Sequence, residues 1–73
     1  MPPKYPVCTS TDVDRVLVKN GYHMVSQKGS HKKFFDGTHV VIVPIHKKDL
    51  KTGTLKGILE QAGMTVEEFK SFL

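Results

Sequence analysis

Cysteine is nearly absent from this chain of 73 residues, and long apolar runs are absent altogether. The single cysteine, Cys8, excludes an intramolecular disulfide, the usual crosslink of small secreted domains. No stretch approaches the ~20 apolar residues that span a bilayer, and no apolar run follows the first charge as in a signal peptide. We therefore expect a cytoplasmic protein with no membrane segment. The short length also excludes barrel enzymes and dinucleotide-binding sheets.

Two common kinds of chemical site are missing as well. The four histidines are separated by eight, eight and seven residues, with the cysteine far from them, which is not the spacing of a zinc site. The sequence contains no glycine-rich loop of the kind that cradles phosphates. We therefore expect neither a metal ion nor a small-molecule cofactor.

Positive charge is present in excess and is concentrated in one part of the chain. The net charge is +4, with 11 basic and 7 acidic residues. Residues 27–56 hold seven lysines and two acids, whereas the rest of the chain is slightly acidic. A clustered basic surface attracts a polyanion, most commonly a nucleic acid. The alternatives are a solvated lysine face and a surface that docks an acidic protein.

The hydrophobic pattern predicts one small α+β domain. Residues 1–8 hold three of the four prolines and predict an extended tail before a domain at 9–73. The expected elements are a helix capped within Thr9–Thr11 and ended by Asn20-Gly21, strands at 22–27, 31–35 and 38–44, a helix capped by Thr54 and closed by Gly63, and a short helix from Thr65.

This α-β-β-β-α order, with an extra C-terminal helix, implies a three-stranded antiparallel sheet with helices on one face. The continuous apolar run Val40–Val43 predicts a strand that is central or covered on both faces.

One histidine stands in a setting suited to catalysis. His31 follows the turn Lys28-Gly29-Ser30, and strand parity places Lys33 on the same face. Imidazole exchanges protons near neutral pH, and lysines stabilise a charged phosphate transition state. The combination suits RNA cleavage without a metal, in which a base removes the proton of a ribose 2′-OH. A non-catalytic contact is the alternative, and His46 is either a second proton donor or a phosphate contact.

The basic turn, the basic loop and a helix N-terminus form the expected RNA-binding surface, because helix N-termini beside lysines bind phosphate. Its members are Lys28, Gly29, Ser30, Lys32, Lys33, His46, Lys47, Lys48 and Lys56. A basic helix start beside a basic sheet edge is also how double-stranded-RNA-binding domains contact grooves by shape.

Several runs of sequence, in order, resemble the HicA-type (YcfA-like) toxins of bacterial and archaeal toxin–antitoxin pairs. The resemblance extends from about Thr11 to Leu73. The matching runs are Leu17–Tyr22, Gln27–His31, Val41–His46, Gly53–Gly63 and Thr65–Phe69.

This resemblance implies a fold like that of double-stranded-RNA-binding domains and cleavage of mRNA independent of the ribosome. It implies inhibition by a HicB-type antitoxin that covers the active face. The family's active histidine falls on His31, supported by Gly29 and Ser30. Two departures are Gly57 within the second helix and the strongly basic pair Lys32-Lys33. A non-catalytic RNA-binding module and a structural subunit that docks an acidic protein are the competing readings.

Overall fold

A computed structural model describes residues 4–73, so the first three residues of the expected tail lie outside the described residues. The elements are α1 (Ser10–Lys19), β1 (His23–Lys28), β2 (His31–Phe35), β3 (Val40–Pro44), α2 (Thr52–Ala62) and α3 (Val66–Ser71). This order confirms the predicted α+β class, which resembles the double-stranded-RNA-binding domain.

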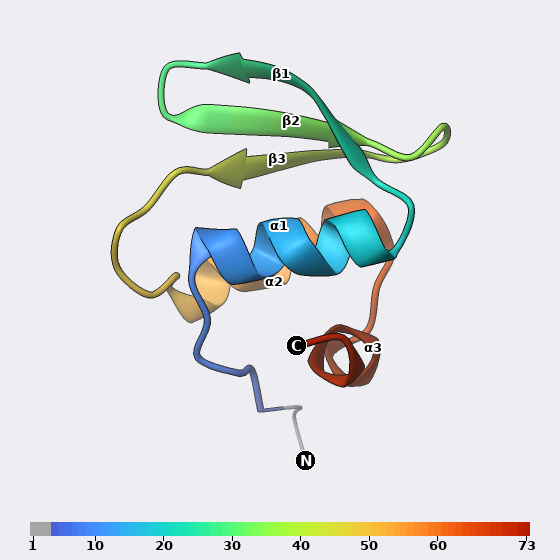
Figure 1. The fold of residues 1–73 in the computed structure, drawn as a ribbon. Helices are drawn as coiled ribbons and strands as arrows, with labels where there is room; N and C mark the ends of the chain where they lie inside the picture. The colour runs from blue at the N-terminus through green and yellow to red at the C-terminus, as the bar shows by residue number, and fades with distance from the viewer. Residues whose placement is uncertain (1–3) are drawn as a thin grey trace.

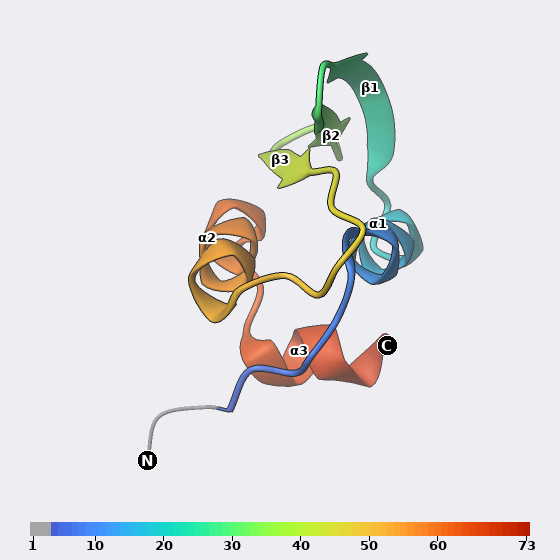
Figure 2. The ribbon, with the colours of Figure 1, turned by 90° about the vertical axis from the view of Figure 1, so that its left-hand side faces the viewer.

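The three strands form one antiparallel sheet in the order β1-β2-β3. Helices α1 and α2 lie on one side of the sheet, nearest to β3, and α3 lies beneath both helices (Figures 1 and 2). The core lies between these layers. Its most deeply buried side chains are Phe69, Leu17, Leu55, Val13, Val16, Val41 and Val43.

Two helices begin with reciprocal capping boxes. The Thr9 hydroxyl accepts from the Asp12 N–H, and the Asp12 carboxylate accepts from the Thr9 N–H. Thr65 and Glu68 repeat this arrangement at α3, as their spacing predicts. The bond from the Thr9 backbone is the main reason that the pKa of Asp12 lies below its usual value.

The predicted N-cap of α2 was wrong by three residues. The helix begins at Thr52 with Lys51 as its N-cap, not with Thr54, and no side chain caps it. The backbone explains the difference, because the Leu55 N–H already donates to the Lys51 carbonyl at 3.0 Å. The first turn therefore forms before the threonine that the sequence suggested, while Gly63 closes the helix in the left-handed conformation as expected.

The prediction that β3 is central or doubly covered was also wrong. β3 is an edge strand, and burial alternates along it, with Val41 and Val43 buried and Val40 and Ile42 exposed. A run of β-branched residues reflects strand propensity and does not report how many faces are covered.

Two strands also start later than predicted. β1 runs from His23 to Lys28, because the Tyr22 N–H donates to the Leu17 carbonyl at 3.0 Å and so belongs to the end of α1. β3 begins at Val40 rather than at residue 38. The cause is the Asp36 carboxylate, which accepts the N–H groups of Thr38 and His39 and so holds them in the turn.

The free edge of β3 is partly closed by a side chain of α2. The Ile42 N–H donates to Gln61 Oε1 at 2.9 Å. Pro44, two residues further along the same edge, has no N–H.

The segment before α1 packs on the domain although it contains neither helix nor strand from residue 4 to residue 9. Cys8 is buried in the core, and its carbonyl accepts from the Leu50 N–H at 2.9 Å. Burial is the main cause that raises the pKa of the Cys8 thiol. This cysteine is therefore a core residue.

None of the helices between residues 4 and 73 is both long enough and apolar enough to cross a membrane.

Candidate nucleic-acid interface

A tight turn places His31 at the start of β2. Lys28 and His31 pair across a two-residue turn, and its first central residue, Gly29, has a φ of +59°. Glycine at that position with positive φ is the pattern of a type II′ hairpin turn. A side chain at residue 29 would be strained by the backbone conformation alone. Gly29 thus fixes the register that joins Lys28 to His31.

The face of the sheet turned away from the helices carries His31 among basic and apolar neighbours. His31 pairs with Lys28 on β1 and with Pro44 on β3. Lys33 lies two residues along β2 on the same face, and it pairs with Ile42. Directly paired residues have side chains side by side. Since His31 and both lysines are exposed, this face, here called the open face, presents an imidazole between two cations.

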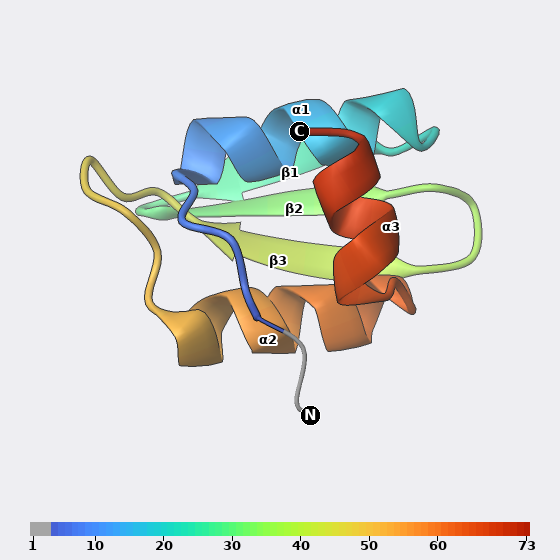
Figure 3. The same ribbon diagram turned by 90° about the horizontal axis from the view of Figure 1, so that it is seen from below.

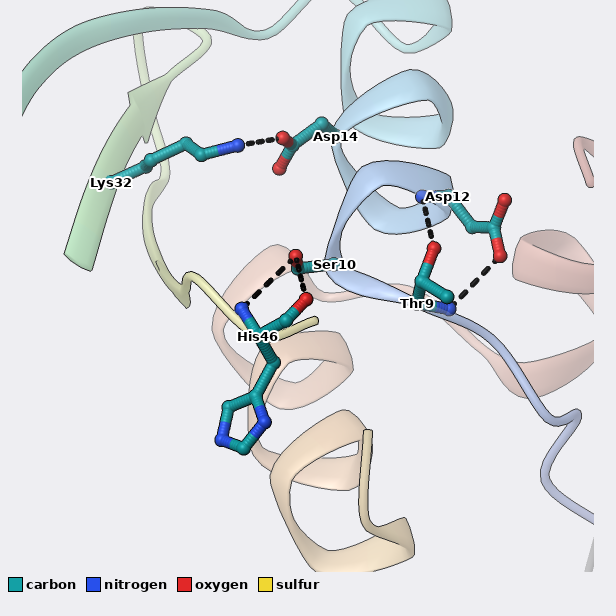
Figure 4. A network of polar contacts seen from close by, with 6 residues as sticks. All are labelled: Thr9, Ser10, Asp12, Asp14, Lys32 and His46. Carbon is teal, nitrogen blue, oxygen red and sulfur yellow. Dashed lines mark hydrogen bonds and ion pairs between the residues drawn. The ribbon is translucent and has the colours of Figure 1, made fainter. Parts of the chain in front are cut away.

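Lys32 lies on the opposite face of β2. It is half-buried and forms an ion pair with Asp14 of α1 (Figure 4). The structure therefore does not bring Lys32 together with His31. Asp14 lies 18 residues before Lys32 in the chain, and nothing in the spacing indicated that the two would pair.

A hydrogen-bonded chain ties the loop after β3 to the turn before His31. The Ile45 N–H donates to the Ser30 carbonyl at 2.6 Å. The next residue, His46, is held by the buried hydroxyl of Ser10, which donates to its carbonyl at 3.2 Å and accepts its N–H at 3.3 Å. The His46 ring points away from Ser10 (Figure 4) and is exposed. Ser10 was predicted only as a possible helix cap, so its link to His46 was missed.

The basic segments gather at one end of the molecule. The turn at residues 29–30, the loop at residues 45–51 and the first turns of α1 and α2 all lie there (Figures 1 and 3). Lys47 and Lys48 are exposed in that loop. Helix N-termini carry partial positive charge, so they add to the potential of the lysines. This end is suited to bind phosphate groups.

Lys56 is separated from the other predicted contacts. It lines a hollow with Tyr5, Glu60 and Glu67 on the side of α2 that faces α3. The structure thus divides the predicted RNA-binding set into an end cluster on the turn, the open face and the loop, and two outliers, Lys32 and Lys56.

The buried Ser10 hydroxyl offers a test of how the loop is held. We expect Ser10→Ala to lower the free energy of unfolding by about 1 kcal/mol, the net value of a typical hydrogen bond. In this variant the exposed backbone groups of His46 form hydrogen bonds to water instead, so the loss of stability stays small. We also expect faster amide hydrogen exchange at Ile45 and His46, measured by NMR.

Ser71→Ala is the matched control, because the Ser71 hydroxyl donates to the Glu68 carbonyl at the surface and lies far from the loop in sequence. It should leave exchange at Ile45 and His46 unchanged. Equal exchange rates in the wild type and Ser10→Ala would mean that Ser10 does not hold this loop.

Within residues 4–73, no group of three or more His, Cys, Asp and Glu side chains is placed to hold a metal ion.

The element order, the three-stranded antiparallel sheet and the helices on one side define an α+β fold like that of double-stranded-RNA-binding domains. A family model described as the HicA toxin of bacterial toxin–antitoxin pairs matches residues 10–64. The chain belongs to this HicA toxin family, and it is therefore the toxin component of a toxin–antitoxin pair. Among curated proteins, none matches the chain.

Proposed function

We propose that this toxin is an endoribonuclease that cleaves mRNA in the cytoplasm without a metal ion, with His31 as its general acid–base residue. The observation that supports the proposal most strongly is the open face, where the exposed His31 pairs with Lys28 and shares its face with Lys33. A proton-transfer group between two cations supplies both acid–base catalysis and stabilisation of the charged transition state, two contributions that assist phosphodiester cleavage.

The chemistry follows from these groups. His31 removes the proton of a ribose 2′-OH, and the resulting oxyanion attacks the adjacent phosphorus. The bond to the 5′ oxygen of the next nucleotide breaks, and that oxygen takes a proton from water or from His46. The protonated His31 then releases its proton to solvent. Lys28 and Lys33 stabilise the negative charge on the phosphate oxygens in the transition state. The products are a 2′,3′-cyclic phosphate and a free 5′-OH.

Binding precedes this step, and the end cluster supplies it. Gly29 and Ser30 bring backbone groups of the turn close to a phosphate, while Lys47 and Lys48 extend the basic surface along the RNA. His46 lies between the turn and this lysine pair and is a phosphate contact or a second proton donor. The partner that restrains the toxin is a HicB-type antitoxin, as family membership supports.

The test is cleavage of a labelled single-stranded RNA by the purified chain in EDTA, with analysis of the product ends. We expect fragments that end in 2′,3′-cyclic phosphate. Fragments with 3′-OH ends, or cleavage only after Mg²⁺ is added, would contradict the mechanism. RNA that is bound but never cut would favour the second candidate, a non-catalytic RNA-binding module, which the same basic end supports.

A further inference from the structure

β1 is the least covered element of the domain. All six of its residues are exposed. The cause is the layer arrangement, because α1 and α2 lie nearest to β3 and β1 lies farthest from the helices (Figures 1 and 2). A strand of a small antiparallel sheet normally buries one face. Within residues 4–73, the inner face of β1 is left without such cover.

A groove of about 530 Å³ lies under this strand, between α1 and the inner face of β1 and β2. Its apolar surface comes from both walls. Val18 of α1 is 60% exposed and Met24 of β1 is 50% exposed, and the buried Phe34 of β2 also lines the groove. Large apolar side chains that are exposed on both sides of one groove mark an interaction site better than scattered ones do.

The rim of the groove is positively charged. Arg15, Lys19 and Lys32 line it together with a single acid, Asp14. Lys32 is paired with Asp14 across the groove. Arg15 lies 3.5 Å from Asp12 in an exposed pair, and the Lys19 ammonium donates to the Phe72 carbonyl at 3.0 Å, so Lys19 has no carboxylate partner within residues 4–73. The chemistry that fits is an apolar side chain flanked by carboxylates. An RNA strand is a poorer fit, because most of the wall surface that it would contact is apolar.

We propose that this groove is a docking site for the antitoxin, which places apolar side chains between Val18 and Met24 and acidic side chains against Arg15 and Lys19. Membership of the toxin family indicates that the partner is an antitoxin. The positive charge of the rim indicates that the docking segment of the antitoxin carries acidic side chains. The proposal rests on the antitoxin partnership of the proposed function and is independent of its ribonuclease step.

The groove and the open face lie on opposite sides of the sheet. Phe34 and Lys32 line the groove, whereas His31 and Lys33 alternate with them along β2 and point to the other side of the sheet. The antitoxin therefore holds the toxin partly through a surface that RNA does not contact. Affinity for the antitoxin and cleavage of RNA can then be changed separately.

Val18→Glu tests this docking site. The variant places a carboxylate on an exposed wall, opposite the acidic and apolar groups of the partner, and should not disturb folding. We expect its affinity for the HicB-type antitoxin of the same toxin–antitoxin pair, measured by titration calorimetry, to fall at least about tenfold, equivalent to ~1.4 kcal/mol. Met24→Glu, on the other wall, should act in the same direction. RNA cleavage by Val18→Glu should equal that of the wild type.

Val7→Glu is the matched control, since Val7 is 79% exposed and does not line the groove. Its antitoxin affinity should stay within about twofold of the wild type, a difference below the ~1.4 kcal/mol of a tenfold change. Circular dichroism of all three variants checks that they are folded.

Wild-type affinity in both groove variants would overturn the docking site, while RNA cleavage by the same proteins would leave the ribonuclease proposal standing. Failure of the wild-type chain to bind the antitoxin would overturn the partnership and the docking site together. If the free chain dimerises in sedimentation and Val18→Glu makes it monomeric, a second copy occupies the groove and the inference fails. Loss of RNA cleavage with unchanged antitoxin affinity would also overturn it.

Discussion

Replacing His31 with alanine should reduce RNA cleavage by about 10²- to 10⁴-fold, the range that a positioned general acid or base contributes. The fold should survive, because the side chain is exposed at the start of β2 and its removal leaves no cavity. RNA binding should also persist, because Lys28, Lys33 and the basic loop remain. The measurement is the rate of cleavage of a labelled single-stranded RNA in EDTA, with affinity followed by fluorescence anisotropy.

His39→Ala is the matched control for this variant. His39 is another exposed histidine, but it lies in the turn between β2 and β3, where its Nδ1 is 3.1 Å from Asp36 Oδ2. That turn is at the opposite end of β2 from His31, so cleavage should continue at the wild-type rate. Equal rates for His31→Ala and the wild type would exclude His31 as the acid–base residue. Loss of binding in His31→Ala would make it a contact residue instead.

Replacing Phe69 with alanine should unfold a large fraction of the protein. Phe69 lies on α3 and is 1% exposed, among the most deeply buried large side chains. Truncating a buried phenylalanine costs about 3–5 kcal/mol. A core in a chain of this size supplies only about 3–5 kcal/mol of net stability. The two quantities are similar, so the variant should be marginally folded or unfolded at room temperature.

The measurement is thermal unfolding followed by circular dichroism, with Leu73→Ala as the control. Leu73 follows α3 and is exposed, so its truncation should leave the midpoint almost unchanged. A loss of 1 kcal/mol lowers the midpoint of a domain this small by about 4–8 °C. A shift of only a few degrees in Phe69→Ala would mean that α3 is peripheral to the fold. Any stability that the variant regains with the antitoxin reports binding to the folded state.

Helix α3 belongs to the fold but lies outside the residues that the family model matches. The match ends at residue 64, before α3 begins at Val66. Phe69 and Val66 are nevertheless part of the buried core. The sequence predicted a short helix from Thr65 without reference to the family, and the capping box of Thr65 and Glu68 that starts this helix is a local feature.

Local signals predicted the fold well because each depends on neighbouring residues. Gly63 as a helix end and the turn at Gly29 depend on backbone conformations that glycine adopts easily. Burial of β3 was predicted wrongly because it depends on how far two helices extend beneath a sheet. The sequence of Val40–Val43 does not contain that information.

In the candidate site, too, the features that depend on neighbouring residues were predictable and the contacts between distant residues were not. Alternation along β2 placed His31 and Lys33 on one face, as the register has them. The pairing of Lys32 with Asp14 and the hold of Ser10 on His46 join residues 18 and 36 positions apart. Such contacts exist only after the helix and the sheet pack together, so residue type and spacing could not reveal them.

The amide of Gln61 has a consequence for the behaviour of the chain at high concentration. An exposed strand edge with free N–H groups is a template for stacking into cross-β fibrils. Along the edge of β3, Ile42 offers its N–H to Gln61 and Pro44 has none to offer. β3 has the strongest tendency to aggregate by composition, but its edge is therefore a poor template for fibril growth. Toxin released from its antitoxin is thus protected against fibril formation through this edge.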